Sequence, residues 1–329
     1  MKVCHFIAST GLGRGEAYID LVNALCERIE IVLLVPQGAL FIPRVDKRIH
    51  IVEYRSKGSR RNPFLYLELY LKFRKINPDM VHTHFAKATE TFYKLNKILK
   101  MPWVSTKHNP RKGRIFNKLD QVIAVSSGVA DSINHNRVTI IHNGISPEVF
   151  PPATEENKLF TIIAVGRLEK VKAFDQLIAE CAQLTFDFTL LIVGDGPEKN
   201  NLVNLAISLN IDKKINFLGY RTDIPRLMHQ ADVVVVCSHN EGFGLVVLEA
   251  LFYGRVLISR DVGISGDILS ERFLIKEFQI ASRLEDVYRN TESFKREFVD
   301  IKKLHGHQYL IDNSSQEHLI FYQKLLLSG

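Results

Sequence analysis

The sequence predicts an α/β protein that consists of two doubly wound, Rossmann-like domains, and three observations support this fold class. Short apolar runs alternate with amphipathic segments along most of the chain, which is typical of a parallel sheet with crossover helices. The 329 residues are enough for two such domains. The alternation is interrupted once, by the aperiodic stretch Phe150–Lys158 with its two adjacent prolines. We therefore predict one domain over residues 1–150 and another over residues 151–313, followed by a helical tail over residues 314–329.

Strands are expected where a short apolar run is bounded by polar or turn-forming residues, and helices where apolar residues recur every three or four positions. In the first domain the expected strands are Lys2–Ile7, Ile31–Val35, Met80–His82, Trp103–Thr106, Gln121–Val125 and Val138–Ile141, and the expected helices are Ala17–Arg28, Phe64–Lys75 and Ala88–Lys100. In the second domain the expected strands are Leu159–Val165, Phe188–Val193, Ile215–Leu218, Asp232–Cys237 and Val256–Ser259, and the expected helices are Phe174–Leu184, Glu198–Leu209, Ile224–Gln230 and Leu245–Phe252.

The composition excludes several classes of protein. Hydrophobic residues make up 46% of the chain and the mean hydropathy is −0.01, as in ordinary globular proteins. The four cysteines lie far apart without metal-ligand spacing, so we expect no disulfide framework and a cytoplasmic location. Residues 1–10 carry too little positive charge for a signal peptide, and no apolar run approaches the roughly 18 residues of a membrane-spanning helix.

Charge is unevenly distributed between the two predicted domains. Residues 1–150 contain 23 Lys and Arg against 12 Asp and Glu, whereas the rest of the chain is mildly acidic. Bases cluster around the apolar-aromatic helix within Arg55–Lys75 and again at Arg111–Arg114. We expect this basic half to meet an anionic membrane surface or an anionic acceptor rather than a nucleic acid. A buried helix with a solvated polar end would explain the leucines of Arg55–Lys75 equally well.

The segment VGRLEKVK, residues 165–172, connects a predicted strand to a predicted helix. Gly166 allows a sharp turn at the strand end, which places Arg167 and Lys172 at the carboxyl edge of the sheet, where doubly wound folds bind ligands. Two cations beside a helix N-terminus suit a diphosphate. The alternative is a pair of solvated surface charges. The turn that begins at Gly194 has the same strand-to-helix character, which by itself is a structural signal.

The segment HNEGFGLVVLEAL, residues 239–251, carries two acids eight positions apart. Glu241 lies in a predicted loop and Glu249 near the second turn of a predicted helix, and both can face the same crevice. The N–H groups between Gly242 and Leu245 can point at an anion. Glu249 is surrounded by apolar residues, where a lone carboxylate is costly unless a partner such as a ribose diol accepts its hydrogen bonds. Taken alone, Glu241 reads as an ordinary loop acid.

Together, these motifs resemble the retaining glycosyltransferases of family 4, which have the GT-B fold. The resemblance implies two Rossmann-like domains that face each other across a cleft, with a C-terminal helix that crosses back to the first domain. It implies that Arg167 and Lys172 hold the donor diphosphate, Glu249 the nucleotide ribose and Glu241 the sugar. The implied donor-binding set is completed by Gly166, Gly194, Gly242, Phe243, Gly244 and Leu245.

The resemblance extends into the first domain. The loop GLGRGE after the first strand resembles the glycine loop of the family, in which Gly13 and Gly15 approach the donor while Gly11, Arg14 and Glu16 face the acceptor. It also implies that His84 lies on the acceptor side. His108 is implied to lie near the donor sugar as a catalytic residue together with Glu241, Arg167 and Lys172. A polar residue at a strand end is the alternative for His108.

Three departures from the family pattern are visible. Ala173 stands where the family often has glycine after the lysine. The loop over residues 261–267 lacks the expected Gly-Gly and Pro-Glu, and residues 270–310 read as short and irregular. These departures affect the sugar-end contacts and the far edge of the second domain more than the phosphate grip.

No metal or cofactor is expected. His82 and His84 share one face of a strand, but two ligands without a third of suitable spacing favour a structural role over a metal site. The leaving diphosphate would instead be stabilised by Arg167, Lys172 and backbone N–H groups.

The sequence therefore predicts an enzyme that transfers a hexose-type sugar, with retention, from a nucleotide sugar to a glycan or glycolipid acceptor. We expect a UDP-sugar ahead of a GDP- or ADP-sugar, and a role in bacterial lipopolysaccharide or other surface-glycan synthesis, peripherally at the inner face of the cell membrane. The alternatives are a sugar-nucleotide epimerase of the same fold and a non-catalytic nucleotide-sugar binding module. A phosphorylase is opposed by chain length, and a glycosidase by the phosphate-gripping bases. A dinucleotide-dependent oxidoreductase is opposed by the GxGxG spacing of the glycine loop.

Overall fold

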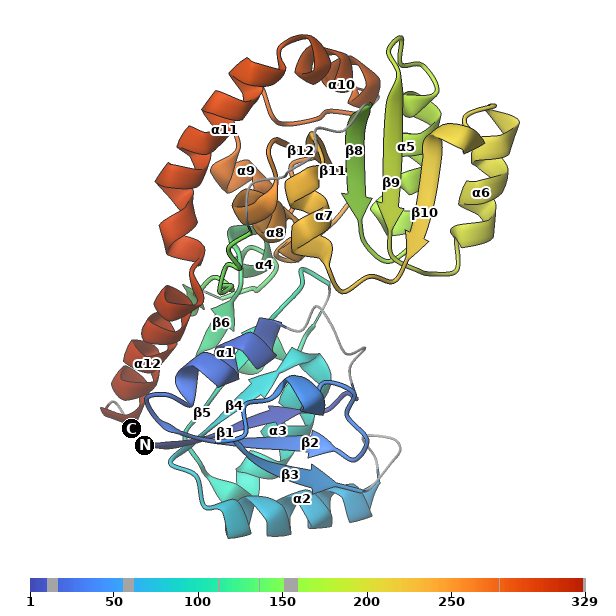
Figure 1. The fold of residues 1–329 in the computed structure, drawn as a ribbon. Coiled ribbons are helices and arrows are strands. Elements are labelled where there is room, and N and C mark those ends of the chain that lie inside the picture. Colours follow the sequence, from blue (N-terminus) through green and yellow to red (C-terminus); the bar gives the residue numbers. More distant parts are fainter. Residues whose placement is uncertain are drawn as a thin grey trace. The chain divides into compact units, whose positions relative to one another are not determined.

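The computed structural model describes residues 1–10, 17–55, 62–111, 113–135, 137–150, 159–277 and 279–327. The chain forms two compact units (Figure 1). Unit 1 comprises Met1–Ser146 and Gln308–Gly329, and unit 2 comprises Pro147–His307. The glycine loop, most of the predicted linker and residues 56–61 of the basic segment lie outside the described residues. None of the helices in the described ranges is long and apolar enough to cross a membrane.

Unit 1 is built on a seven-stranded parallel sheet with the order β3-β2-β1-β4-β5-β6-β7. Its strands are β1 Lys2–Ile7, β2 Glu30–Pro36, β3 His50–Tyr54, β4 Met80–His84, β5 Trp103–Lys107, β6 Val122–Ala124 and β7 Val138–Ile140. Its helices are α1 Ala17–Leu25, α2 Pro63–Ile76, α3 Phe85–Leu99, α4 Ser127–Ala130 and α12 Ile311–Leu327, with short 3₁₀ turns η1 Ile42–Arg44, η2 Phe116–Lys118 and η5 Gly306–Tyr309, the last beginning at the end of unit 2. Strand β3 is absent from the sequence-based prediction, because its half-exposed pattern contains no continuous apolar run.

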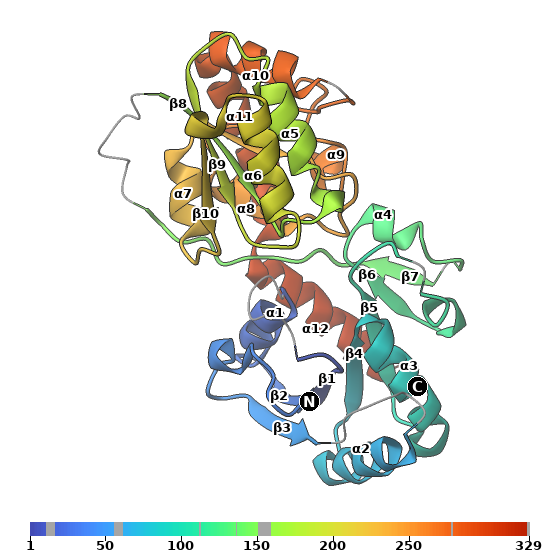
Figure 2. The same ribbon diagram turned by 90° about the vertical axis from the view of Figure 1, so that its right-hand side faces the viewer.

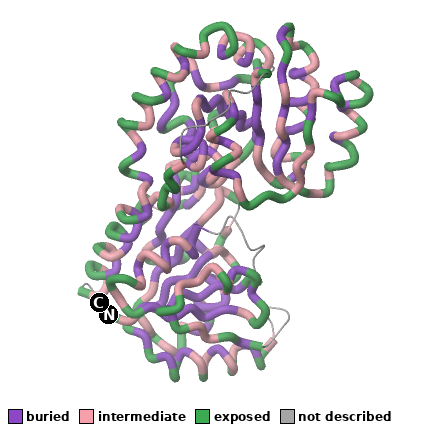
Figure 3. The backbone as a smooth tube through the Cα atoms, in the orientation of Figure 1, coloured by how far each residue is buried: buried purple, intermediate pink, exposed green. Residues whose placement is uncertain are grey.

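Alternate residues of β1 divide the core of unit 1 into two layers, as the two-residue period of a strand requires. Val3 and Ile7 face a cluster that includes residues of α1 and α12. Cys4, Phe6 and Ala8 face a second cluster formed with α2 and α3. Figure 3 shows the strands of this sheet as a buried layer between helices that are exposed on their outer sides. Both faces of the sheet are covered, as expected for a parallel sheet.

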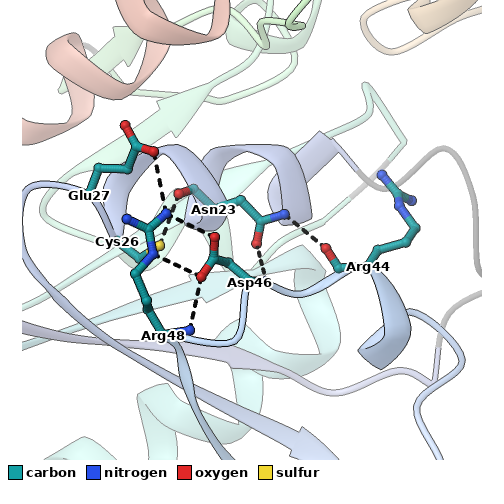
Figure 4. A network of polar contacts seen from close by, with 6 residues as sticks. All are labelled: Asn23, Cys26, Glu27, Arg44, Asp46 and Arg48. Atoms are coloured by element: carbon teal, nitrogen blue, oxygen red, sulfur yellow. Dashed lines mark hydrogen bonds and ion pairs between the residues drawn. The ribbon is translucent and has the colours of Figure 1, made fainter.

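The connection between β2 and β3 is fastened to α1 by a polar network (Figure 4). The side chain of Asn23 accepts a hydrogen bond from the Asp46 N–H at 2.9 Å and donates one to the Arg44 carbonyl oxygen at 2.9 Å. Asp46 in turn binds the Arg48 guanidinium, with a closest contact of 2.8 Å, and this partner lowers the pKa of the Asp46 carboxyl to about 2. The amide of one helix residue therefore holds the end of η1 and the residues that follow it.

Unit 2 is built on a five-stranded parallel sheet with the order β10-β9-β8-β11-β12. Helices α5 and α6 lie together on one face of this sheet and α7 and α8 on the other (Figure 2). Its strands are β8 Phe160–Val165, β9 Phe188–Val193, β10 Ile215–Gly219, β11 Val233–Val236 and β12 Leu257–Ser259. Its helices are α5 Phe174–Cys181, α6 Lys199–Ser208, α7 Ile224–Gln230, α8 Leu245–Tyr253, α9 Ser265–Ile268, α10 Ile280–Arg289 and α11 Thr291–His305, with 3₁₀ turns η3 Lys170–Lys172 and η4 Asp212–Lys214.

Residues 270–310, which depart from the family pattern, are mostly helical. Helices α10 and α11 occupy most of this stretch. Ile280, Leu284 and Val287 of α10 are buried at positions i, i+4 and i+7. In α11, Phe294 and Phe298 are buried at positions i and i+4. The apolar residues are few because each helix buries only one narrow stripe, so the surrounding polar residues obscured the helical period.

The tail helix α12 belongs to unit 1 and begins at Ile311, three residues before the predicted start. Tyr322 is fully buried in the cluster that α12 shares with α1. The Ser314 hydroxyl donates to the His142 carbonyl oxygen at 2.7 Å, and Ile145 pairs with Leu310 in an isolated bridge. Residues from both ends of the chain thus complete one folded unit.

Candidate active site

The strand order of unit 2 reverses between β8 and β11, which are hydrogen-bonded neighbours. The chain leaves β8 toward β9 on one side of the sheet and leaves β11 toward β12 on the other. In doubly wound folds, ligands bind at the carboxyl ends of the strands at this point. The loop after β8 carries Gly166, Arg167 and Lys172, and the loop after β11 carries Glu241. The two segments that the sequence singled out are therefore brought together at the expected place.

Lys172 and Glu241 form the central contact of this site. The Lys172 Nζ lies 2.5 Å from the Glu241 Oε1, and the two side chains are 18% and 15% exposed. The backbone on both sides is tied as well. The His239 N–H donates to the Val171 carbonyl oxygen at 2.8 Å, and the Cys237 Sγ lies 3.1 Å from the Lys172 carbonyl oxygen. The cation is thus held in a fixed position at the sheet edge by the loop that carries its counter-charge.

Arg167 is placed differently from Lys172. Its side chain is 56% exposed, and its Nε lies 3.0 Å from the Glu169 Oε1. An exposed ion pair of this kind is weak and easily exchanged for another anion. Arg167 therefore matches a mobile clamp over a ligand, whereas Lys172 matches a fixed point charge.

Two glycines, Gly194 and Gly196, allow the loops after β8 and β9 to pack closely against each other. Gly194 has a φ of +133°, and a Cβ there would lie 1.9 Å from the Gly166 carbonyl oxygen. A Cβ on Gly196 would lie 2.5 Å from the Leu168 carbonyl oxygen. Leu168 also donates its N–H to the Asp195 carbonyl oxygen at 3.0 Å. Glycine is thus required by close backbone approach, and the turn is more than a generic connection.

Ala173 adopts a backbone conformation that glycine reaches more readily than alanine. It adopts a φ of +53° between η3 and α5, a left-handed conformation that costs alanine roughly 1–2 kcal/mol. The residue is completely buried and its carbonyl oxygen accepts the Leu177 N–H, so the conformation is enforced by the start of α5. Where this chain departs from the family pattern, Ala173 therefore has a strained backbone. The neighbouring lysine, Lys172, is present as in that pattern.

The corner between Glu241 and Glu249 is formed by Gly244, which has a φ of +83° at the start of α8. The loop over residues 261–267 packs against this corner, because the Ile264 N–H donates to the Phe243 carbonyl oxygen at 3.0 Å. Gly263, with a φ of +60°, leaves no room there for a Cβ. Gly263 is thus a glycine of this loop that close contact with the Phe243 backbone requires.

Glu249 lies one turn after Leu245 on the side of α8 that is not fully buried. Both residues are half-buried, whereas Leu248 and Ala250 are completely buried. The carboxylate is therefore neither in the core nor on an open helix surface. A half-buried acid on the first turns of a helix at this edge is suitably placed to accept hydrogen bonds from a ligand.

The sequence reasoning missed Arg260, the first residue after β12. The residue is 8% exposed, and its guanidinium binds two neutral acceptors, the His239 Nδ1 at 2.7 Å and the Gln176 Oε1 at 2.5 Å. The sequence offered one sign of its role, because Arg260 directly follows a predicted strand and so lies at the carboxyl end of that strand. Arg260 adds a third cation near the ligand edge and fixes the orientation of the His239 imidazole.

In unit 1 the corresponding reversal of strand order lies between β1 and β4. His84, which the resemblance places on the acceptor side, is the last residue of β4 and is completely buried. It binds the imidazole of His108, which is half-buried after β5, with 3.1 Å between nitrogens. Gly11, Gly13, Arg14, Gly15 and Glu16 lie outside the described residues.

A pocket of about 390 Å³ lies on the other face of unit 1, near the carboxyl ends of β1, β2 and β3. Phe6, Leu65 and Leu69 form its apolar floor. Arg55 and Lys87 give it two cations. Its size and charge suit a small anionic or amphiphilic group.

Two family models match consecutive parts of the chain. The model described as "Glycosyltransferase Family 4" matches residues 15–149, and the model described as "Glycosyl transferases group 1" matches residues 146–298. The chain belongs to the family 4 glycosyltransferases. Membership accounts for the two parallel α/β units, and the GT-B fold predicted from the motifs is confirmed.

Individual relatives of this family 4 protein are distant. Glycogen synthase of Mycobacterium tuberculosis is 28% identical over 226 residues, which cover 59% of this chain and 55% of that protein, so the chain spans about half the length of that relative. The lipopolysaccharide core biosynthesis glycosyltransferase LpsE of Rhizobium meliloti is 26% identical over 273 residues, covering 79% and 78% of the two chains. The crystal structure of Anabaena Alr3699/HepE in complex with UDP-glucose superposes with a TM-score of 0.88 at 18% identity, covering 98% of this chain and all of that one.

Proposed function

We propose that the protein is a retaining glycosyltransferase that moves a hexose-type sugar from a nucleotide sugar, with UDP as the favoured nucleotide, to a glycan or glycolipid acceptor. The observation that carries this proposal is the half-buried Lys172–Glu241 pair at the strand reversal of unit 2. This pair fixes a cation and a carboxylate side by side. A sugar diphosphate requires both, the cation for its phosphates and the carboxylate for its sugar. The solved HepE complex with UDP-glucose supports the choice of nucleotide, by analogy of fold.

Each site residue has a proposed role in this reaction. Lys172 and Arg167 stabilise the charge that develops on the leaving diphosphate, which needs no metal ion. Glu249 accepts hydrogen bonds from the ribose hydroxyls, and Glu241 orients both Lys172 and the sugar. Because none of the residues that the structure describes is placed as a covalent nucleophile, we infer that the acceptor attacks from the face that the diphosphate leaves, and that a diphosphate oxygen takes its proton.

The acceptor is proposed to bind unit 1 at the pocket floored by Phe6 and flanked by Arg55 and Lys87. Helix α2, beside this pocket, displays an apolar stripe to solvent: Phe64, Leu67 and Leu71 are 73%, 57% and 58% exposed. The exposed bases Arg74 and Lys75 close the helix, and its one acid, Glu68, lies 3.8 Å from Lys72. An exposed apolar stripe with basic neighbours suits the surface of an anionic membrane.

A lipid-linked surface glycan is therefore the proposed class of acceptor, with the enzyme at the cytoplasmic face of the membrane. The likeness to LpsE supports lipopolysaccharide core synthesis as the setting.

The proposed function is tested by screening UDP-, GDP- and ADP-sugars for thermal stabilisation, followed by product analysis. We expect the cognate nucleotide sugar to raise the Tm, and to raise it further as its concentration increases above its Kd. Transfer to a lipid-linked acceptor should then give a product whose anomeric configuration, read by NMR coupling constants, matches that of the donor. Inversion would refute the retaining mechanism, and a lack of stabilisation by every nucleotide would refute the donor site.

The same assay separates the alternatives. An epimerised sugar formed from donor without acceptor would assign an epimerase, and binding without donor consumption would assign a binding module.

Membrane contact has its own test. Replacing Leu67 and Leu71 by serine should abolish co-sedimentation with vesicles that contain phosphatidylglycerol. Ile98→Ser is the matched control, because Ile98 is 70% exposed at the end of α3, outside the stripe. Equal loss in both variants, or equal binding to phosphatidylcholine vesicles, would contradict the proposed surface.

A further inference from the structure

Three imidazoles form a continuous hydrogen-bonded chain in unit 1. The Nδ1 of His5, in β1, lies 2.9 Å from the Nε2 of His84, and the Nδ1 of His84 lies 3.1 Å from the Nε2 of His108. His5 and His84 are completely buried, and His108 is half-buried. The chain thus runs from the interior of the sheet to the site residue that follows β5.

All three rings are neutral at physiological pH. Burial lowers the pKa of His5 and of His108 to about 3, with a smaller contribution from His318. Burial also lowers the pKa of His84 well below its ordinary value, and the neighbouring imidazoles lower it further. Each ring therefore carries one N–H and one lone pair.

The number of protons restricts the tautomers of the whole chain. Each of the two hydrogen bonds uses one N–H and one lone pair, so a single N–H and a single lone pair remain for the two end nitrogens. These ends are the Nε2 of His5 and the Nδ1 of His108. If His5 keeps the N–H at its end, His108 presents a lone pair, and the reverse also holds.

The inner end decides between the two arrangements. The His5 Nε2 is buried and has no hydrogen-bond partner in the part of unit 1 that the structure describes. A buried N–H without an acceptor is less favourable than a buried lone pair without a donor. His318, in the same cluster, follows this rule: its Nδ1 faces the Ser314 carbonyl oxygen at 2.7 Å, so it must be protonated there, and its unpartnered Nε2 is a lone pair.

We propose that His84 is a positioning residue that, together with the unpartnered end of the chain at His5, fixes His108 as the Nδ1–H tautomer. His108 then offers a hydrogen-bond donor to an oxygen of the substrate and has no lone pair with which to accept a proton. This inference rests on the proposed function for the identity of the substrate but not for the tautomer itself. It makes His108 a donor that binds a hydroxyl or phosphate oxygen and excludes it as the base that activates the acceptor.

A metal ion is the competing explanation for this cluster. One nitrogen from each of His5, His82 and His84 lies within 4.8 Å of the others. However, both nitrogens of His82 are already engaged, by Tyr322 at 2.5 Å and Thr106 at 2.6 Å, and so are both nitrogens of His84. A metal would have to break these bonds, and no described carboxylate or thiolate joins the group to offset its charge.

The test is a long-range ¹H–¹⁵N correlation spectrum of the full-length protein labelled with ¹⁵N-histidine, with His108 assigned from the spectrum of His108→Gln. We expect the wild type to show a protonated Nδ1 and an unprotonated Nε2 at His108. Protonation at Nε2, a mixture of tautomers, or a doubly protonated ring at pH 7 would overturn the proposal. This spectrum requires no substrate, so it can fail or succeed independently of the proposed function.

Two matched variants separate positioning from packing. His84→Phe and His5→Phe each remove a completely buried imidazole from the same sheet face. Only His84→Phe removes the partner of His108, so it should release His108 into a tautomer mixture and lower kcat/KM about threefold to tenfold, the effect of one hydrogen bond. His5→Phe should leave the His108 signals in the wild-type pattern, because the His84 Nε2 then becomes the buried end without a partner and stays a lone pair by the same rule. Identical spectra at His108 in the two variants would contradict the assignment.

Metal titration completes the test. Protein treated with a chelator and then titrated with Co²⁺ or Zn²⁺ should bind no ion at this cluster. Stoichiometric binding that His82→Phe abolishes would overturn the proposal and assign a metal site instead.

Discussion

The two sheets of this chain have the same doubly wound order around their reversal points, yet they place opposite kinds of polar groups there. In unit 1 the reversal between β1 and β4 is filled by buried, neutral, hydrogen-bonded imidazoles. In unit 2 the reversal between β8 and β11 carries the Lys172–Glu241 ion pair, with Arg167 and Arg260 nearby. The comparison teaches that one backbone topology can serve two binding chemistries. Fixed charges suit a diphosphate, and neutral donors and acceptors suit hydroxyl groups.

The first prediction concerns stability at acidic pH, in which the two units should differ most. In unit 1 burial lowers the pKa of His5 and His108 to about 3 and that of His318 to about 4. A histidine that stays neutral when folded binds a proton near pH 6.5 when unfolded, so stability is complete above that pH and falls as the pH drops toward the folded pKa. At pH 5 each such histidine lowers the free energy of unfolding by roughly 2 kcal/mol.

Hydrogen exchange at pH 7 and pH 5 measures this difference directly. Unit 1 should lose protection first, because the described part of unit 2 contains no completely buried histidine. His318→Gln should make unit 1 less sensitive to acid, whereas earlier loss of protection in unit 2 would break the comparison.

The second prediction concerns the charged reversal point. Lys172→Met removes the fixed cation and leaves Glu241 with little solvent, so we expect kcat/KM to fall by about two to three orders of magnitude. Lys170→Met is the matched control, since Lys170 is an exposed lysine in the same 3₁₀ turn and should retain most activity.

A double-mutant cycle of Lys172→Met with Glu241→Gln then measures their coupling. The effects of the two substitutions should be strongly non-additive, because each removes the other's partner. Additive losses would show that the ion pair is not a functional unit.

The smallest effect is expected at Ala173, where the two substitutions Ala173→Gly and Ala182→Gly can be compared. Ala173 has a φ of +53°, whereas Ala182 has a φ of −65° at the end of α5. Glycine relieves strain at position 173 but only adds unfolded-state entropy at position 182. Ala182→Gly should lower the free energy of unfolding by roughly 0.5–1 kcal/mol, and Ala173→Gly should not lower it. Equal destabilisation in denaturant unfolding would show that position 173 carries no strain.

Much of the fold was predictable because it depends on local patterns. The buried strands β1, β9 and β11 are short apolar runs. Gly166 and Gly194 mark two strand ends whose backbones approach each other closely, and Gly244 is left-handed at the start of α8. Strand β3 and helices α10 and α11 were missed because they bury narrow faces among many polar residues.

The candidate site was predictable in its residues but not in its pairings. The positions of Lys172 and Glu241 after predicted strands place both at the same edge of the sheet. However, no local sequence pattern indicates that they bind each other. The contacts of His5 with His84, and of Arg260 with Gln176, join residues that are 79 and 84 positions apart. Such contacts follow from sheet order and loop packing, which a single sequence does not specify.

We propose that the nucleoside diphosphate binds at the reversal point of unit 2. Isothermal titration of UDP into the wild type, Lys172→Met, Glu249→Gln and Lys170→Met tests this directly. We expect binding by the wild type and Lys170→Met, and at least about tenfold weaker binding by Lys172→Met and Glu249→Gln, as expected from the loss of a hydrogen bond to a charged group. Wild-type affinity for UDP in both Lys172→Met and Glu249→Gln would contradict it.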